Sequence, residues 1–304
     1  MKESQPQAIW VIPHQWAIPP LASVLLKSNL NFHVNVQDYM DAKQVRARFG
    51  GERGDRWARL AEQLYAKAAT RDAISHTMVA DLQAKTGCPA MQMLRAGIES
   101  EDLNLLASEK EKLRDRIRIA YAGTIVVEKE FALFVSALGK IRNRLPRQVS
   151  LEFFGNHSYH NREWFDSTWM NEHGNLSALE LSKALRECDW GFSPMGLTDE
   201  DPNYNRFSLP TKFITYLAAG LPVVTLGHQE SSVVKMALQY DVGLCATASD
   251  VETLSGQLLA ALSEPCPKSK YRAEILRCTS TEFDAEKMRT VLYDCFRKCA
   301  SLNR

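Results

Sequence analysis

The chain has 304 residues, of which 45% are hydrophobic and 24% charged, and its formal net charge is +1. This length allows two modest domains, the composition is that of a globular protein, and the small net charge gives no support for a nucleic-acid partner. No apolar run reaches the roughly 18 residues of a membrane-spanning helix, and the polar start is not typical of a signal peptide. The seven cysteines are scattered without a C-x-x-C pair, so we expect reduced thiols in a cytoplasmic protein.

The amino-terminal part alternates short apolar runs with stretches of helical spacing, an order that indicates β-α-β units and a parallel sheet. A polar, basic, glycine-bearing stretch at 39–54 is predicted as a flexible connection, and a charged stretch at 101–116 as a linker. The predicted strands are 8–12, 32–37, 72–75 and 90–94, and the predicted helices are 21–27, 56–69 and 77–85.

A second series of strands and helices begins at 118. Two of its strands end at a glycine, Gly123 and Gly155. Open parallel sheets bind ligands at the edge formed by the carboxyl ends of their strands. The predicted strands are 118–122, 149–154, 190–193, 222–226 and 243–246, and the predicted helices are 130–141, 176–187, 211–219, 231–239, 251–262 and 281–300.

The most informative stretch is 208–226, which reads Ser-Leu-Pro-Thr-Lys-Phe-Ile-Thr-Tyr-Leu-Ala-Ala-Gly-Leu-Pro-Val-Val-Thr-Leu. Pro210 is expected in the first turn of a short helix, Gly220 is expected to end it, and a buried strand follows. Ser208, Thr211 and Lys212 lie at the start of this helix, where unpaired N–H groups and the helix dipole favour an anion. The stretch therefore predicts an anion-binding helix start.

This stretch resembles the donor-site helix of glycosyltransferases of the GT-B fold, and among them of family 4, in which it reads roughly S-L-P-x-K-x-x-E-Y-L-A-A-G-x-P-V-V. Residues 73–82 and 97–99 are similar to two further segments of that family. The resemblance implies an α/β fold of two Rossmann-like domains with parallel sheets, the first of them truncated. The implied domains are 1–116 on the acceptor side, 117–280 for the nucleotide sugar, and a helix at 281–304 that packs back on the first.

The resemblance also implies a donor site. Lys129 follows Gly123 by six residues, as in the family's G-R-x-x-x-x-K-G, with Thr124 in place of the Arg. We expect Lys129 and Lys212 to stabilise the leaving diphosphate electrostatically, although Lys129 is also consistent with an ordinary exposed lysine. Thr215 stands where the family has a Glu that bonds the ribose. The other implied donor-binding residues are Gly155, Gly174, Asn175, Ser208, Leu209 and Thr211.

Three residues are candidates for the acceptor side of the cleft. His14 follows the strand 8–12, where related enzymes often place a His facing the donor sugar, and it is the third expected catalytic residue. Trp16 lies beside it, and Asp38 ends the next strand. The alternative for His14 is an ordinary loop histidine, and the alternative for Asp38 is a structural cap.

No metal site is expected. His157, His160 and His173 are close in sequence, but they lack the cysteines or carboxylates at fixed helical spacing that a metal site needs, so we interpret them as part of a polar loop. The resemblance implies a retaining, metal-independent reaction without a cofactor other than the nucleotide-sugar substrate.

The predicted function is hexosyl transfer from a nucleotide-diphosphate sugar to a hydroxyl of a carbohydrate or lipid-linked acceptor, as in polysaccharide biosynthesis. The basic residues within 43–71 form either a solvated face or a peripheral contact with the anionic inner face of a membrane. The alternative is a non-catalytic remnant that binds a nucleotide, or a partner chain that supplies the missing half-domain. An epimerase of the same fold is a weaker third hypothesis.

Overall fold

The computed structural model describes residues 8–38, 50–88, 92–93, 96–108, 114–198 and 202–302. The chain divides into two compact units, one made of Met1–Gly97, Asp201–Leu209 and Ala285–Arg304, the other of Ile98–Glu200 and Pro210–Asp284. Each unit contains one sheet, and all the strand pairs of both sheets are parallel. The prediction of an α/β fold with parallel sheets is confirmed.

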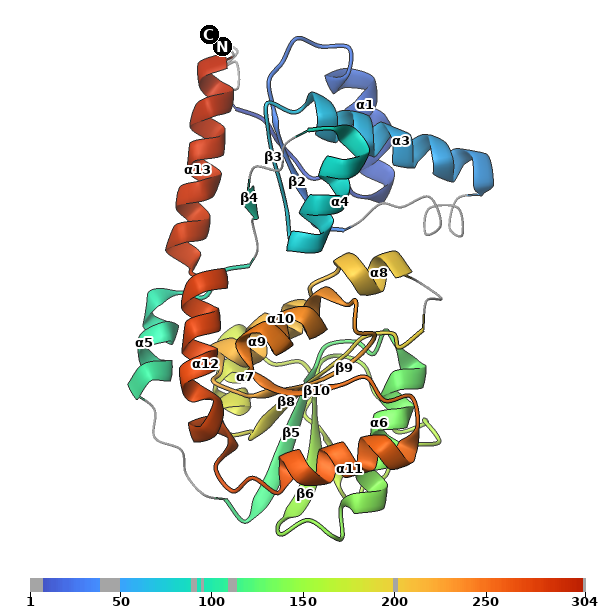
Figure 1. Cartoon of the computed structure of the whole chain (residues 1–304), viewed down its shortest axis with the longest axis vertical. Helices are drawn as coiled ribbons and strands as arrows, with labels where there is room; N and C mark the ends of the chain where they lie inside the picture. The colour runs from blue at the N-terminus through green and yellow to red at the C-terminus, as the bar shows by residue number, and fades with distance from the viewer. Residues whose placement is uncertain are drawn as a thin grey trace. The chain divides into compact units, whose positions relative to one another are not determined.

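The sheet of the first unit has the order β1-β2-β3-β4 within the described residues (Figure 1). Each strand pairs with the next one in the chain, so helices connect the parallel neighbours. The strands are β1 (Trp10–Val11), β2 (His33–Val36), β3 (Thr70–Ala73) and β4 (Gln92–Met93), and the helices are η1 (Gln15–Ala17), α1 (Ile18–Leu25), α3 (Gly51–Lys67), α4 (His76–Thr86), α8 (Pro202–Phe207) and α13 (Ala285–Leu302).

The two faces of this first sheet differ in chemistry. Val34 and Val36 of β2 belong to an apolar core that includes residues of α1 and α3, such as Leu64. The alternate residue His33 lies on the other face, edge-on to Phe296 of α13 with ring centroids 5.9 Å apart. The helix α13 therefore covers a face of the sheet that carries buried polar side chains.

The sheet of the second unit has the order β10-β9-β8-β5-β6-β7. Its carboxyl edge collects the ends of strands that are distant in sequence, which is the property that makes such edges binding sites. The strands are β5 (Arg116–Ala122), β6 (Gln148–Phe154), β7 (Met170–Glu172), β8 (Trp190–Pro194), β9 (Val223–Leu226) and β10 (Gly243–Ala246), and the helices are α5 (Ser100–Ser108), α6 (Glu128–Ile141), α7 (Ala178–Arg186), α9 (Thr211–Ala218), α10 (Ser232–Tyr240), α11 (Val251–Leu262) and α12 (Pro267–Glu282).

Helices cover both faces of this second sheet (Figure 1). On one face α6 and α11 enclose the main apolar core, in which Phe134 stacks on Phe192 with ring centroids 3.7 Å apart. On the other face lies α9, whose Tyr216 ring occupies the space that a side chain at Gly191 would take. Because Gly191 of β8 has no side chain, α9 packs close to the sheet. This close packing positions the start of α9.

Several predicted elements need correction. The stretch 101–116 is not only a linker, because α5 occupies its first half; Glu101 and Asp102 lie in the first turn of α5, where they favour a helix. The glycine-bearing connection ends earlier than predicted, since α3 already begins at Gly51. Besides α5, four elements were not predicted from the sequence: η1, β7, α8 and α12.

The predicted final helix at 281–300 is interrupted. Helix α12 ends at Glu282 and α13 begins at Ala285. Between them, the carbonyl of the buried Phe283 accepts a hydrogen bond from the Ile98 N–H at 2.5 Å, and Asp284 forms a parallel bridge with Ile98. This strand-like pairing takes the backbone out of the helical conformation. The second compact unit begins at Ile98, and the last segment of the first unit begins at Ala285. The predicted domains were 1–116, 117–280 and 281–304.

Candidate functional site

The start of α9 forms the centre of the candidate site in the second unit. Helix α9 begins at Thr211, as predicted; Pro210 is its N-cap in an extended conformation, and no side chain of the described residues caps the helix. The amino group of Lys212 donates to the Tyr121 hydroxyl at 2.7 Å and to the Thr124 carbonyl at 3.3 Å. It also lies 4.0 Å from the centre of the Tyr121 ring. The helix start therefore combines unpaired N–H groups with a cation held in place.

Burial changes the chemistry of this lysine. Removal from water lowers the pKa of Lys212 from 10.5 to about 8. The amine still carries its charge in most molecules at neutral pH, but in an environment with little water, where a cation attracts an anion more strongly. This combination suits the binding of a phosphate group.

Tyr216 anchors the helix to the neighbouring strand. Its hydroxyl accepts a 2.7 Å hydrogen bond from the N–H of Ala122, the last residue of β5. Tyr216 is fully buried, so this bond also satisfies a backbone donor that would otherwise be costly. Lys212 is consequently fixed relative to the carboxyl end of β5.

Three predicted glycines line the carboxyl edge of neighbouring strands. The N–H of Gly123, after β5, donates to Phe154 at 2.8 Å, and that of Gly155, after β6, donates to Gly174 at 2.9 Å. Gly123 and Gly174 have φ of +89° and +70°, a region that favours glycine. Among the described residues, chain neighbours apart, no atom lies within 4 Å of the position where either would carry a side chain. The structure thus brings these glycines together around open space.

The remaining predicted residues of this unit lie at the same edge or nearby. Lys129 is exposed in the first turn of α6, and Thr124 is exposed with its carbonyl bonded to Lys212. The Thr215 hydroxyl donates to the Thr211 carbonyl within α9 at 3.0 Å. Asn175 is exposed in the turn between β7 and α7.

Ser208 and Leu209 belong to the first unit, in the segment Asp201–Leu209. Leu209 is buried, and the Ser208 N–H donates to the Tyr204 carbonyl at 3.1 Å. Ser208 and Leu209 thus belong to a different compact unit from Thr211 and Lys212, with which the motif groups them in sequence.

The acceptor-side candidates form a second cluster, in the first unit. Nδ1 of His14 lies 2.9 Å from a carboxylate oxygen of Asp38, and both side chains are about half exposed or more. Trp16 is 61% exposed and meets the buried Trp57 edge-on, with ring centroids 5.3 Å apart. The structure therefore pairs the two polar candidates, which the sequence left as separate predictions.

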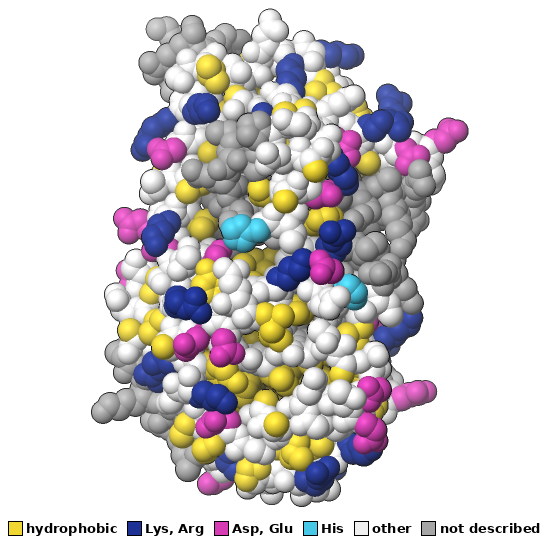
Figure 2. Space-filling view, viewed as in Figure 1, with side chains coloured by type: hydrophobic (Ala, Val, Ile, Leu, Met, Phe, Trp, Pro, Cys, Tyr) yellow, Lys and Arg dark blue, Asp and Glu magenta, His cyan; other side chains and the backbone are white. Residues whose placement is uncertain are grey.

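A groove of about 870 Å³ lies between α1 and α3 of the first unit. Apolar side chains and four basic ones line it, and within the described residues none of those four forms an ion pair. The apolar lining includes Ala22, Leu26, Trp57 and Leu60, the basic residues are Lys27, Arg53, Arg56 and Arg59, and two carboxylates, Glu52 and Asp55, also contribute. On the face shown in Figure 2, basic and acidic side chains are interspersed.

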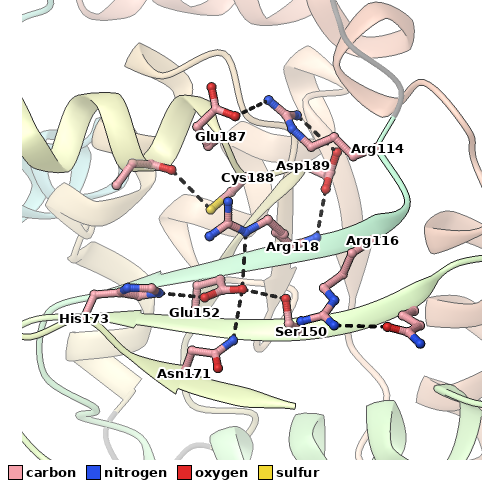
Figure 3. Close-up of polar contacts among 12 residues, drawn as sticks. Arg114, Arg116, Arg118, Ser150, Glu152, Asn171, His173, Glu187, Cys188 and Asp189 are labelled. Atoms are coloured by element: carbon pink, nitrogen blue, oxygen red, sulfur yellow. Dashed lines mark hydrogen bonds and ion pairs between the residues drawn. The ribbon is translucent and has the colours of Figure 1, made fainter. Parts of the chain in front are cut away.

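Sequence reasoning missed two buried polar residues beside the glycine edge. Tyr121 appears in the sequence as one more apolar strand residue, and its role follows from its contact with Lys212, 91 positions away. Glu152 is 2% exposed and lies on β6 among four polar side chains (Figure 3). The available signal for Glu152 was a carboxylate within an otherwise apolar strand pattern.

The described residues contain no group of three or more His, Cys, Asp or Glu side chains that could hold a metal ion. His160 pairs with Glu172 at 3.0 Å and His173 with Glu152 at 2.6 Å. In the same part of the chain, no helix is both long and apolar enough to cross a bilayer.

No protein-family model and no curated protein matches the chain by sequence. Solved structures do match by fold. Sucrose-phosphate synthase from Thermosynechococcus elongatus has a TM-score of 0.70 at 13% identity, over 96% of this chain and 73% of that one. A UDP-forming α,α-trehalose-phosphate synthase from Burkholderia xenovorans has 0.65 at 13%, over 98% and 76%. WaaG, a glycosyltransferase involved in lipopolysaccharide biosynthesis, has 0.57 at 14%, over 94% and 80%.

These likenesses define the fold class. The chain has the α/β fold with parallel sheets of the GT-B glycosyltransferases. At such low identity the comparisons establish the fold alone. Assignment to family 4 and truncation of the first domain stay predictions.

Proposed function

We propose that the chain is a glycosyltransferase that moves a sugar from a nucleotide-diphosphate sugar to a hydroxyl acceptor. The observation that carries this proposal is Lys212, a desolvated amine fixed at an uncapped helix start beside open glycines. A diphosphate needs positive charge, N–H donors and close backbone approach, and this edge of the sheet offers all three.

In the proposed reaction, Lys212 and the first N–H groups of α9 hold the diphosphate. As the bond between sugar and phosphate breaks, negative charge grows on the leaving oxygen, and these preorganised donors stabilise it. Lys129 contributes a second positive charge from the start of α6. We infer a retaining, metal-independent transfer in which the leaving phosphate oxygen takes the proton of the attacking hydroxyl.

The proposed roles of the other residues follow from their positions. Gly123 allows the diphosphate to approach the backbone, and Thr215 contributes one hydroxyl to the ribose. His14 is proposed to contact the transferred sugar, with Asp38 orienting its ring through the 2.9 Å contact. Trp16 is proposed to contact a carbohydrate acceptor.

Isothermal titration with UDP, GDP and ADP tests the donor site. We expect one of them to bind the unmodified chain and binding to be lost in Lys212→Ala, whereas Lys183→Ala on α7 serves as the control because it removes an exposed lysine. Equal affinity in Lys212→Ala and the unmodified chain would refute the phosphate assignment. The comparisons do not favour the alternative of a non-catalytic remnant.

We further propose that the basic groove between α1 and α3 binds an anionic membrane surface, which would bring the protein to a lipid-linked acceptor. Support comes from Arg53, Arg56 and Arg59, which share one side of α3, and from the apolar groove floor. In a flotation assay at low salt, we expect the unmodified protein to float with phosphatidylglycerol vesicles. The variant with Arg53, Arg56 and Arg59 all replaced by Glu is expected not to float. Equal flotation of both proteins would contradict this role.

A further inference from the structure

Glu152 is the centre of a buried polar network on one face of the second sheet (Figure 3). Its carboxylate accepts from Ser150 at 2.5 Å, from Arg118 and Asn171 at 3.3 Å each, and lies 2.6 Å from Nε2 of His173. Burial opposes ionisation, but the bonds from Ser150 and His173 and the Arg118 charge outweigh it and hold the pKa of Glu152 below its usual range. The side chain is therefore a carboxylate at neutral pH.

This carboxylate determines which nitrogen of His173 carries hydrogen. An ionised carboxylate only accepts hydrogen bonds, so Nε2 of His173 must be the protonated nitrogen. In the neutral ring the other nitrogen, Nδ1, is then an acceptor. Within the described residues no hydrogen bond or ion pair engages Nδ1, and the His173 side chain is 33% exposed. The network thus presents one hydrogen-bond acceptor of defined chemistry to the outside.

The ring of His173 is also held in position. It stacks on Phe154, with centroids 4.8 Å apart and planes 15° apart, and its backbone N–H donates to Phe153 at 2.9 Å. The carboxyl end of β6 and one buried carboxylate therefore fix this side chain. A fixed acceptor is what base recognition needs, because a mobile one would lose affinity on ordering.

His173 directly follows the carboxyl end of β7 and precedes Gly174. The strand β7 lies two places from β5 in the sheet, or about 10 Å at the usual strand spacing. Lys212 contacts the end of β5. A nucleoside diphosphate that has its phosphates at β5 can therefore lay its base across the ends of β6 and β7.

We propose that Nδ1 of His173 recognises the base of the bound nucleoside diphosphate by accepting a hydrogen bond from a base N–H, and that Glu152 is the positioning residue that sets the ring for this bond. The inference rests on the proposed function, since it takes the nucleotide as the ligand of this edge. It adds a specificity-determining side chain directly before Gly174 and Asn175, which the resemblance implies as donor-binding residues.

The test compares the best-binding nucleoside diphosphate with its analogue methylated on the base N–H, for example UDP with N3-methyl-UDP. In the unmodified chain we expect the methylated compound to bind about tenfold more weakly, the effect of one hydrogen bond. In His173→Phe, which keeps a stacked ring but no nitrogen, we expect both compounds to bind equally. In Glu152→Gln, which keeps the size of the side chain but can orient either amide atom toward the ring, we expect an intermediate ratio.

Inorganic diphosphate is the internal control for folding and for the phosphate site. Its affinity is expected to be unchanged in His173→Phe and Glu152→Gln and lost in Lys212→Ala. If diphosphate and nucleotides bind but the methylated compound binds as well as its parent, or His173→Phe weakens both equally, base recognition by His173 is refuted while the donor site stands. If neither diphosphate nor any nucleotide binds the unmodified chain, the donor site itself is refuted, and this inference with it.

Discussion

Replacement of Lys212 by methionine is expected to stabilise the fold while it abolishes donor binding. Burial lowers the pKa of this amine from 10.5 to about 8, and the difference corresponds to about 3 kcal/mol of destabilisation when the amine is charged. Methionine has a similar length and no charge. The gain in stability from removing the buried charge is reduced because the variant loses the hydrogen bonds to Tyr121 and Thr124, each of which contributes about 1 kcal/mol. The net expectation at pH 7 is a gain of about 1 kcal/mol.

The pH dependence provides the sharper test. Below pH 8 the amine of Lys212 is protonated in both the folded and the unfolded chain. The buried charge therefore destabilises the folded chain by its full amount in this range. Between pH 8 and 10.5 the unfolded chain binds the proton more tightly, and the stability of the unmodified protein rises with pH relative to the variant. The advantage of Lys212→Met should therefore disappear, and then reverse, as the pH rises through this window.

Urea unfolding followed by tryptophan fluorescence at pH 7, 8.5 and 10 measures the stability difference between Lys212→Met and the unmodified chain, and how this difference changes with pH. Lys183→Met on α7 is the matched control, because this lysine is exposed, and its effect should be small and independent of pH. A Lys212→Met variant that is less stable at pH 7 by the same amount as at pH 10 would show that the amine is not desolvated. The electrostatic argument for a phosphate site at α9 would then fail.

Three further substitutions test the framework around the sites. Tyr216→Phe removes the acceptor of the buried Ala122 N–H, so it should cost about 1–3 kcal/mol in unfolding free energy and weaken nucleotide binding; an unchanged urea midpoint would contradict the anchor. Gly123→Ala meets open space but must adopt φ near +89°, so calorimetric melting should show a loss of about 1–2 kcal/mol, and no loss would mean that the turn relaxes. Ser75→Ala removes the hydroxyl that accepts from the Met78 N–H and donates to the Phe207 carbonyl, which should cost about 2 kcal/mol in unfolding free energy, about 1 for each bond. Ser75→Thr keeps a hydroxyl that can form both bonds, so it should restore most of this loss, and no recovery would contradict the role of the hydroxyl.

Local sequence signals were sufficient for most elements of the second unit. The predicted strand 243–246 and helix 251–262 coincide with β10 and α11. Both are bounded by strong local signals, since Asp250 caps α11 with its side chain and β10 is a short apolar run after a turn. The stretch after Leu209 likewise forms a helix and then a strand, α9 and β9. Such signals act within a few residues and need no tertiary context.

Where local signals were weak, the predictions failed. Helix α12, with the sequence PKSKYRAEILRCTSTE, shows no clear apolar stripe, and the break after it depends on Phe283 pairing with Ile98. The strand β7 has three residues and exists through its pairing with β6. Tertiary contacts, not propensity, stabilise these elements.

Local sequence patterns were enough to predict the parallel α/β architecture, the helix start that carries Lys212 and the glycines that follow strands, because strand periodicity, helix caps and glycine turns are local properties. The tertiary structure alone decided the chemistry of the site. The lowered pKa of Lys212 depends on its burial, the pairing of His14 with Asp38 on two loops that meet, and the orientation of His173 on a carboxylate 21 positions away. Burial and pairing arise between segments distant in the chain, and a linear sequence carries no signal for which of them will meet.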